Sequence, residues 1–568
     1  MADGPVGDIN AGQERRLRAD ETRGASLADR LSQGLNRLSW RTPIHKLRLR
    51  GRYPLQLIDV PADPIPGRPR AGRALIEGQM RLGSETVALD ALDRGGFSPA
   101  FTDHLQSFAW LRDLAAGSER SAARPVAERL MRRWLAAHGR TVSEPAWRAD
   151  LWGRRILFWS AYAPFLLDTA DAEYRKQVLN ALARGARHLD KAADSAAQGL
   201  PRVAAWAGVI AAGLLIPGGD LRTAHGEAGI ARALALAMHA DGGLCSRVPA
   251  EQLALVELLA QLRAVYEVRA RPPSGAVARA LAESVPVLMS ITLGDGGLSS
   301  WQGGGPGTAG RVAAAVAAAG VRGGERDDAR DWGYQRLVAA DARLVMDAGP
   351  PPVAGLARGG CASTLAFEFS DGAQRLIVNC GGGAGLPSEL AEGLRTTAAH
   401  STLTLAETNS TSLHADGTMG KGVGEVTLSR GGGETGLRLE AEHDGYARRF
   451  GFAHRRRLIL SADGRVLDGE DRLVPAGRRK PGDTTAFTIR FHLAPGLDTV
   501  ITADGQGALL RPGDGRPWQF RTRAGTLAVE ESLWVDAAGR PRPSVALVVS
   551  GTAPAEGATV PWSLRRVR

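Results

Sequence analysis

The stretch Leu365-Ala366-Phe367-Glu368-Phe369, followed after a turn by Arg375 to Val378, decides the fold of the second half of this chain. Its apolar residues alternate or run together between turn residues, which is typical of strands with a buried face. The pattern recurs past Tyr334 in roughly a dozen segments without intervening helices. It predicts an antiparallel β-sandwich of two sheets. Further strands are expected at Ser401 to Leu405, Gly436 to Ala441, Arg457 to Leu460, Phe487 to His492, Leu527 to Val535 and Val545 to Val549.

The first half of the chain has a different period. From about Phe101 to Leu293, apolar residues recur at helical spacing, and many similar-length hairpins in series favour an (α/α) toroid-like domain over a bundle. We therefore expect a basic arm over residues 1–45, a helical domain over 46–325 and a β-sandwich domain over 326–568. The expected helices are one that opens at Arg124 to Leu130 with Pro125 in its first turn, then Ala149 to Leu167, Glu173 to Ala193, Pro201 to Leu215, Ala228 to Met238, Ala250 to Val268 and Gly275 to Leu293. The glycine-rich stretch Gly294 to Asp331 is expected to be a linker or flexible lip.

Charge and composition narrow the classes of partner. The 568 residues carry a formal charge of +11, mostly from arginine, whose planar guanidinium binds carboxylates and sulfates through two donors. This excess favours a polyanionic partner, although an Arg-rich and Ala-rich codon bias explains it equally well. No zinc-finger, RNA-binding or helix-turn-helix pattern indicates nucleic acid.

Cysteine content and the amino terminus bear on the compartment. Cys245, Cys361 and Cys380 are too few and too widely spaced for a disulfide framework or a paired zinc signature. The segment Met1 to Arg23 is polar and lacks the apolar core of a secretory signal. The longest apolar run, Val203 to Pro217, is too short to span a bilayer and is interpreted as a buried helix. These features predict a cytoplasmic protein with no transmembrane segment and an unknown oligomeric state.

A series of short motifs in fixed order gives the β half a resemblance to a known family. Together they resemble the carboxy-terminal domain of heparinase II/III proteins, and Asp241-Gly242-Gly243 through Pro249 is similar to a segment at the mouth of that family's toroid. The motifs are Gly333-Tyr334-Gln335-Arg336-Leu337, Asp347-Ala348-Gly349-Pro350, Leu365 to Glu368, Val378-Asn379-Cys380-Gly381, Arg395 to Thr402, His443-Asp444-Gly445-Tyr446 and His454-Arg455-Arg456.

The resemblance implies β-elimination of an acidic, uronic-acid polysaccharide in a cleft between toroid and sandwich. Such a lyase must neutralise a carboxylate, remove the proton beside it and stabilise the departing oxygen. The family also implies a periplasmic or envelope location as the alternative to the cytoplasm. The proton-transfer candidates are His400, Tyr446 and Tyr334, for each of which a packing role is the other interpretation.

The candidates for binding the polymer are all basic. Arg247 or Arg395 is expected to face the carboxylate, although Arg247 could equally form a salt bridge with a neighbouring helix. His454 and Arg455 could line a basic groove, although a charge run on a strand is more often a solvated face.

The motif alignment also implies a metal site and a departure from the family. Placing the strands by Leu365 to Glu368 puts Cys361, Asn379 and His400 at the positions of metal ligands, so a single divalent ion in the sandwich is the one cofactor to consider. A hydrogen-bonded cluster without an ion is the alternative. The same placement puts Gly359 where the family often carries its catalytic histidine, and glycine cannot transfer a proton.

Two other functions remain open on this evidence. A catalytically inactive glycan-binding or envelope-assembly protein on the same scaffold is favoured by Gly359 and Asn379. A glycoside hydrolase would need two carboxyl groups, for which Asp444 and Glu442 are candidates.

Overall fold

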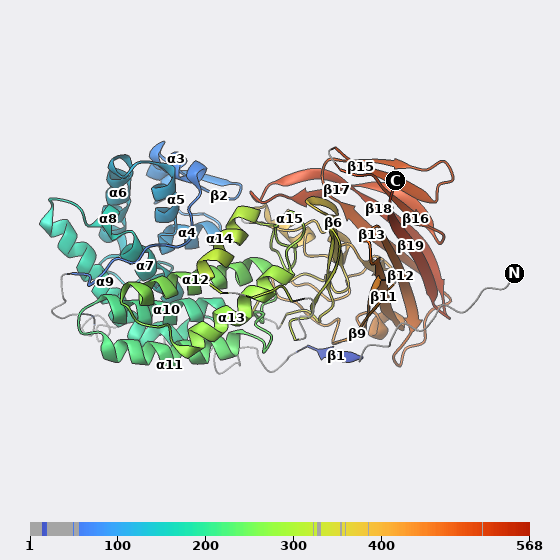
Figure 1. The fold of residues 1–568 in the computed structure, drawn as a ribbon, viewed down its shortest axis with the longest axis horizontal. Helices are drawn as coiled ribbons and strands as arrows, with labels where there is room; N and C mark the ends of the chain where they lie inside the picture. Colours follow the sequence, from blue (N-terminus) through green and yellow to red (C-terminus); the bar gives the residue numbers. More distant parts are fainter. Residues whose placement is uncertain are drawn as a thin grey trace.

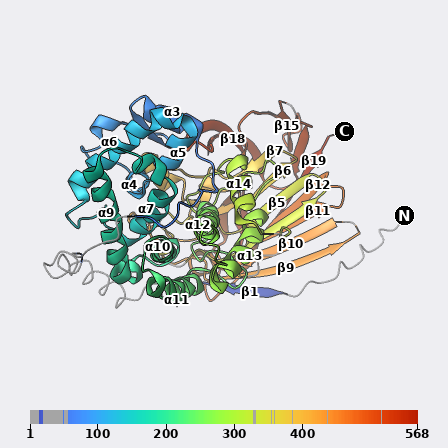
Figure 2. The ribbon, with the colours of Figure 1, turned by 60° about the vertical axis from the view of Figure 1, so that its left-hand side comes forward.

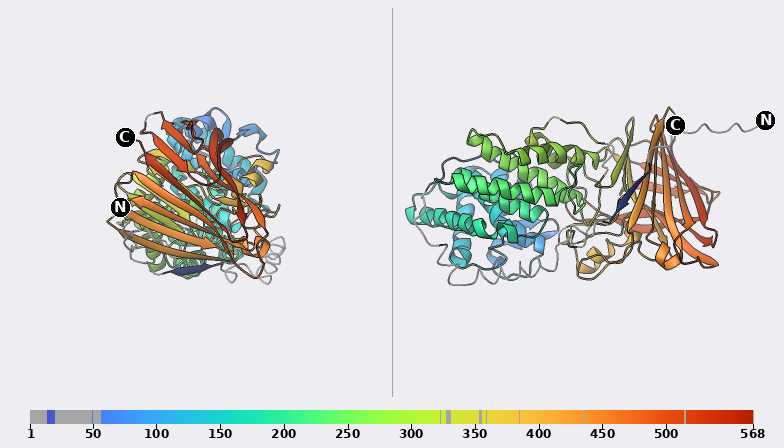
Figure 3. Two further views of the ribbon diagram at one scale, coloured as in Figure 1. Left: turned by 90° about the vertical axis from the view of Figure 1, so that its right-hand side faces the viewer. Right: turned by 90° about the horizontal axis from the view of Figure 1, so that it is seen from below.

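The computed structural model describes residues 14–19, 49, 56–321, 323–326, 331–352, 355–357, 359–383, 385–434, 436–513 and 515–567. Most of the predicted basic arm, residues 1–45, lies outside these described residues. In the described part, a helical half is followed along the chain by a β half, and the two lie side by side (Figure 1; Figure 3, right panel). The predicted fold class, a toroid-like helical domain followed by an antiparallel β-sandwich, is confirmed.

The long helices of the first half match the predicted apolar periodicity closely. Helices α9, α10, α12 and α13 begin within one residue of the predicted starts. The helices are α3 (Pro69–Ile76), α4 (Pro99–Ser107), α5 (Trp110–Gly117), α6 (Arg120–His138), α7 (Ala149–Ala161), α8 (Ala163–Leu166), α9 (Ala172–Ala192), α10 (Leu200–Leu215), α11 (Asp220–Ala237), α12 (Pro249–Val268), α13 (Gly275–Ser290) and α14 (Ala309–Ala319), with the short hairpin of β2 (Gln79–Leu82) and β3 (Glu85–Ala88).

Three details of the helical prediction are wrong. Helix α6 begins at Arg120, so Pro125 lies inside the helix rather than in its first turn. Helix α11 begins at Asp220, before the strongly apolar stretch that marked it in the sequence. The stretch predicted to be a linker contains α14, whose first turn is capped by the Thr308 hydroxyl accepting a hydrogen bond from the Arg311 amide. Alanine, the strongest helix former, outweighs the flanking glycines there.

The centre of the helical half is α10, nearly all of whose residues are buried. It packs closely on α7 because glycines face each other at the crossing. A Cβ atom at Gly153 would lie 2.0 Å from the Ala204 carbonyl oxygen, and one at Gly208 would lie 2.3 Å from the Gly153 Cα. No helix of the described residues is long and apolar enough to cross a membrane.

The β half contains two large antiparallel sheets. In the described residues, one has the order β1-β9-β10-β11-β12-β19-β16-β15-β14 and the other β17-β18-β13-β7-β6-β5-β4, with β8 paired to β13. Apolar side chains from both sheets form the core between them. The strands are β1 (Arg15–Arg18), β4 (Tyr334–Ala339), β5 (Ala342–Asp347), β6 (Phe367–Asp371), β7 (Gln374–Val378), β8 (Leu403–Leu405), β9 (Glu425–Gly433), β10 (Gly436–His443), β11 (Phe452–Ser461), β12 (Val466–Pro475), β13 (Thr484–Leu493), β14 (Leu497–Ile501), β15 (Gly507–Pro512), β16 (Trp518–Thr522), β17 (Thr526–Val535), β18 (Pro541–Pro554) and β19 (Ala558–Arg566).

The junction of the halves is formed by the end of the helical region and the start of the sandwich. Figure 2 shows α12, α13 and α14 on the side of the helical half that faces β5, β6 and β7. Trp332, just before β4, donates its indole N–H to the Leu244 carbonyl at 2.8 Å. The junction is therefore packed through side chains of both halves.

Candidate functional site

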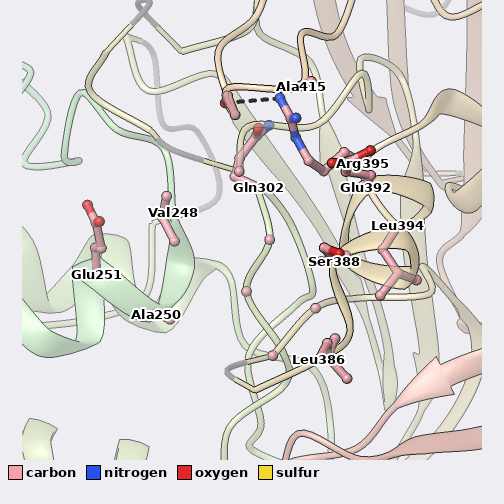
Figure 4. A pocket seen from close by; sticks show the side chains of 17 residues that line it. Val248, Ala250, Glu251, Gln302, Leu386, Ser388, Glu392, Leu394, Arg395 and Ala415 are labelled. Atoms are coloured by element: carbon pink, nitrogen blue, oxygen red, sulfur yellow. Dashed lines mark hydrogen bonds between the residues drawn. The ribbon is translucent and has the colours of Figure 1, made fainter. Parts of the chain in front are cut away.

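A pocket of about 410 Å³ lies at the junction of the two halves. Figure 4 shows Val248 and Glu251 on its helical side and Arg395, Glu392 and Leu386 on its sandwich side. Its position matches the cleft expected between toroid and sandwich. The lining residues are Val248, Ala250, Glu251, Gln302, Gly303, Gly304, Gly359, Gly382, Gly383, Leu386, Ser388, Ala391, Glu392, Leu394, Arg395, Ala415 and Gly417.

Glycine backbone forms much of the pocket wall because several segments approach one another closely there. A Cβ atom at Gly382 would lie 2.4 Å from the Gly303 carbonyl oxygen, so a side chain at Gly382 would collide with the opposite segment. Gln302 holds the same wall by donating to the Ser363 hydroxyl at 3.1 Å and accepting from the Cys361 amide at 2.7 Å. The predicted flexible lip is therefore a fixed wall at Gln302 to Gly304.

Arg395 is the one predicted site residue that lines the pocket with a charged side chain. Its guanidinium is buried and donates to four backbone carbonyls, those of Gly360 at 2.9 Å, His414 at 3.1 Å, and Gly417 and Thr418 at 3.0 Å each. Arginine has five N–H donors, so these contacts use four of them. The contacts tie α15 (Ser388–Gly393) and the segment after it to the loop around Gly417.

The other charged groups of the pocket are acidic. Glu251 is half-buried near the start of α12, and burial raises the pKa of its carboxyl group. Glu392 is exposed at the end of α15. With one arginine and two glutamates among its described lining residues, the pocket is not the guanidinium-rich trough that an acidic polymer would favour.

The Arg395 contacts give a direct test of its role in the pocket wall. Replacing Arg395 by Ala leaves several carbonyls without their donor, and we expect a loss of about 1–3 kcal/mol in stability. The loop at His414 to Thr418 should then exchange its backbone amides faster. Hydrogen exchange followed by mass spectrometry measures this, and unchanged protection of the loop would contradict the assigned role.

Arg247 and Tyr334 are buried together away from the pocket lining. Arg247 forms an ion pair with Asp347 at 2.5 Å and donates through Nε to the Trp332 carbonyl at 2.8 Å. The Tyr334 hydroxyl donates to the Arg247 carbonyl at 2.7 Å, and burial raises the pKa of Tyr334 well above its ordinary value. These contacts join the helical half to the sandwich, and they give Arg247 no free face toward a substrate.

His400 and Tyr446 are also buried and outside the pocket lining. His400 Nδ1 lies 2.8 Å from the Thr396 carbonyl oxygen, and burial lowers the pKa of His400 to about 4. The Tyr446 hydroxyl donates to the Leu403 carbonyl at 2.9 Å, and burial raises its pKa. Both side chains are engaged with backbone groups of the sandwich, and their catalytic roles stay predictions without support from these contacts.

The remaining predicted binding residues lie on β11, away from the pocket lining. His454 Nε2 is 2.7 Å from Asp471 Oδ1 inside the sandwich. Arg455 forms a salt bridge with Glu442 at 2.7 Å on the outer side of the sheet. The other residue of the hydrolase pair, Asp444, accepts hydrogen bonds from the Gly424 and Glu425 amides. The structure thus does not bring these side chains to the pocket.

The three predicted metal ligands each have other partners. Asn379 Nδ2 donates to Glu368 at 3.2 Å, and its Oδ1 accepts from the Ser401 amide at 2.9 Å. Cys361 contacts the Gly359 carbonyl at 3.5 Å, and burial raises the pKa of its thiol to about 12, which disfavours the thiolate that binds metals. In the described part of the chain, no cluster of three or more His, Cys, Asp or Glu side chains could hold a metal ion. These contacts fit the hydrogen-bonded cluster rather than a metal site.

The buried histidines predict how stability depends on pH. Burial lowers the pKa of both His400 and His492 to about 4, against an ordinary value of 6.5. The unfolded chain therefore takes up protons between pH 6.5 and 4 while the folded chain does not, so stability falls as the pH falls through this window. Each histidine contributes about 3 kcal/mol of this loss. Urea unfolding at several pH values measures it, and replacing His492 by Gln should flatten the dependence, whereas an unchanged slope would contradict the assignment.

Comparisons with known proteins agree with this architecture. Residues 321–563 match the family described as Heparinase II/III-like, C-terminal. The structure of heparan sulfate lyase HepC from Pedobacter heparinus, in a mutant form, aligns with a TM-score of 0.60 at 14% identity over 95% of this chain and 88% of that one. A heparinase III structure aligns with a TM-score of 0.65 at 13% identity over 83% and 78% of the two chains. The chain belongs to the heparinase II/III family.

A more similar relative is not named for cleavage. This chain is 30% identical over 547 residues to FtsZ-localized protein C of Caulobacter vibrioides, with 92% of each chain covered. The solved lyases share the fold at much lower identity. The family relationship therefore establishes a polysaccharide-lyase-like scaffold for this chain.

Proposed function

We propose that this chain acts by binding rather than by cleavage, as a heparinase-fold protein that works with FtsZ in envelope assembly. The observation that carries the proposal is the pocket lining, whose described residues include no His, Tyr, Lys or Cys. Gly359, at the position where the resemblance places a catalytic histidine, lines the same pocket. The similarity to FtsZ-localized protein C supports the second part of the proposal.

Fluorescence microscopy of the living host cell tests the proposed association. A fluorescent fusion of the full chain should co-localise with FtsZ and disperse when FtsZ is depleted. A fusion that stays uniformly distributed with FtsZ present would contradict the proposal. A free fluorescent protein expressed at the same level is the control for localisation.

A second candidate function is a lyase for an acidic polysaccharide, with Glu251 as its proton-transfer group. It is favoured by the raised pKa of Glu251 and by the neighbouring cation Arg395, which would face the substrate carboxylate. Elimination in this pocket would proceed without the histidine and tyrosine candidates of the sandwich. Glu251→Gln removes the carboxylate while keeping its size, and would abolish such an activity.

A further inference from the structure

An uncompensated basic patch lies at one end of the sandwich, outside the lining of the junction pocket. It consists of Arg448 and Arg449 on α16 (Ala447–Phe450) together with Arg478, Arg479 and Lys480 in the loop after β12, and is called the end patch below. All five residues are exposed. Five cations on two short segments form the kind of local excess of charge that attracts an acidic partner.

The two segments of the end patch are held against each other by backbone contacts. The Ala476 amide donates to the Gly451 carbonyl at 2.8 Å. Gly451 has a φ of +78°, and a Cβ atom there would lie 2.5 Å from the Arg479 carbonyl oxygen and 2.8 Å from the Pro481 nitrogen. The glycine therefore allows the loop to cross directly over the end of α16, which places the two groups of cations side by side.

The charges of the end patch are not neutralised within the described part of the chain. The only interaction found there for the five side chains is a ring contact, with Arg449 Cζ 5.2 Å from the centre of the Phe450 ring. The nearby Asp444 carboxylate is already engaged by the Gly424 and Glu425 amides. By contrast, arginines on the adjacent sheet face, such as Arg455 and Arg457, have glutamate partners on neighbouring strands.

We propose that the end patch is a docking surface for an acidic polypeptide segment, an inference that rests on the proposed function because that function requires a protein partner. Membrane binding at an interface usually adds apolar side chains to the cations, and single-stranded nucleic acid needs aromatic platforms. The end patch presents neither. Flexible acidic segments need little shape complementarity and bind exposed cations through charge. The exposed large apolar residues of the described chain all lie elsewhere, at Ile58, Val60, Ile76, Leu221, Leu236, Val500, Ile501 and Val567.

Charge reversal at the loop tests the proposal with a fluorescein-labelled octaglutamate peptide as the probe. The wild-type full chain should bind the peptide at low salt, as measured by fluorescence anisotropy, and Arg478→Glu with Arg479→Glu and Lys480→Glu should weaken binding by about tenfold. The matched control reverses three exposed arginines outside the end patch, Arg516, Arg523 and Arg542, and should bind as the wild type does. A second variant, Arg448→Ala with Arg449→Ala, changes α16 without reversing charge and should weaken binding to a smaller extent.

The outcomes separate this proposal from its rivals and from the proposed function. Equal binding by the loop variant and the control would overturn it. So would a wild-type chain that ignores the peptide but binds hyaluronan, or vesicles of phosphatidylcholine and phosphatidylglycerol in equal parts, through the same cations. A chain that binds the peptide through the end patch but does not co-localise with FtsZ would leave the end patch established and refute the proposed function.

Discussion

Replacing Arg247 by Met is expected to destabilise the protein by about 3–5 kcal/mol, because the change leaves Asp347 buried without its positive partner. The side chains of Arg247 and Asp347 are 5% and 1% exposed, so water cannot replace the lost contact. The Arg247 guanidinium also supports the Trp332 carbonyl, and its cation lies 4.7 Å from the centre of the Tyr334 ring. Thermal and urea unfolding measure the effect.

A matched control distinguishes this junction contact from an ordinary surface ion pair. Arg455→Met removes a salt bridge to Glu442 on the partly exposed sheet face and should cost less than about 1 kcal/mol. Combining Arg247→Met with Asp347→Leu removes both charges and should recover part of the loss. A cost for Arg247→Met as small as that of Arg455→Met would show that the junction is not held by this pair.

Replacing Asp471 by Ala is expected to have an effect of similar size inside the sandwich. Its carboxylate accepts from Arg456 Nε at 2.8 Å, lies 2.7 Å from His454 Nε2, and accepts from the Trp562 indole at 2.9 Å. Removing it leaves the fully buried Arg456 without a counter-charge, at a cost of about 3–5 kcal/mol. Urea unfolding measures the loss, and a cost below about 1 kcal/mol would contradict the role given to Asp471.

The same carboxylate adds to the acid sensitivity of the fold. Despite its burial, the neighbouring Arg456 and His454 hold the pKa of Asp471 well below its ordinary value. A lowered folded-state pKa means that the contribution to stability is full above about pH 4 and is lost as the pH falls further. This loss lies below the window of the buried histidines, so acid unfolding should steepen again under pH 4.

The fold could be predicted largely because periodicity is a local property of the sequence. The apolar run of α10 and the alternating residues of β11 and β13 each bury the face that the pattern indicates. The errors fell where another local signal competed. Pro125 marked a helix start although the helix accommodates it internally, and the glycines around α14 hid an alanine helix.

The candidate site was less predictable because it depends on contacts between distant segments. Motif order placed Arg395 and Gly359 correctly enough that both line the pocket, but it gave no means of separating buried packing residues from pocket residues. Arg247, Tyr334 and His400 satisfy their polar atoms inside the protein. The sequence analysis missed Glu251, which looked like one acidic residue in the first turn of a helix, and the glycines at 303 and 304 were the available signal for the wall.

The most direct measurement is the ultraviolet absorbance of unsaturated product when the purified full chain is incubated with a panel of uronic-acid polymers. Because the described pocket lining offers no His or Tyr, we expect the absorbance to stay at the level of the protein-free control, with no new reducing ends. Product that forms with the wild type and disappears in Glu251→Gln would contradict the binding function and establish a lyase.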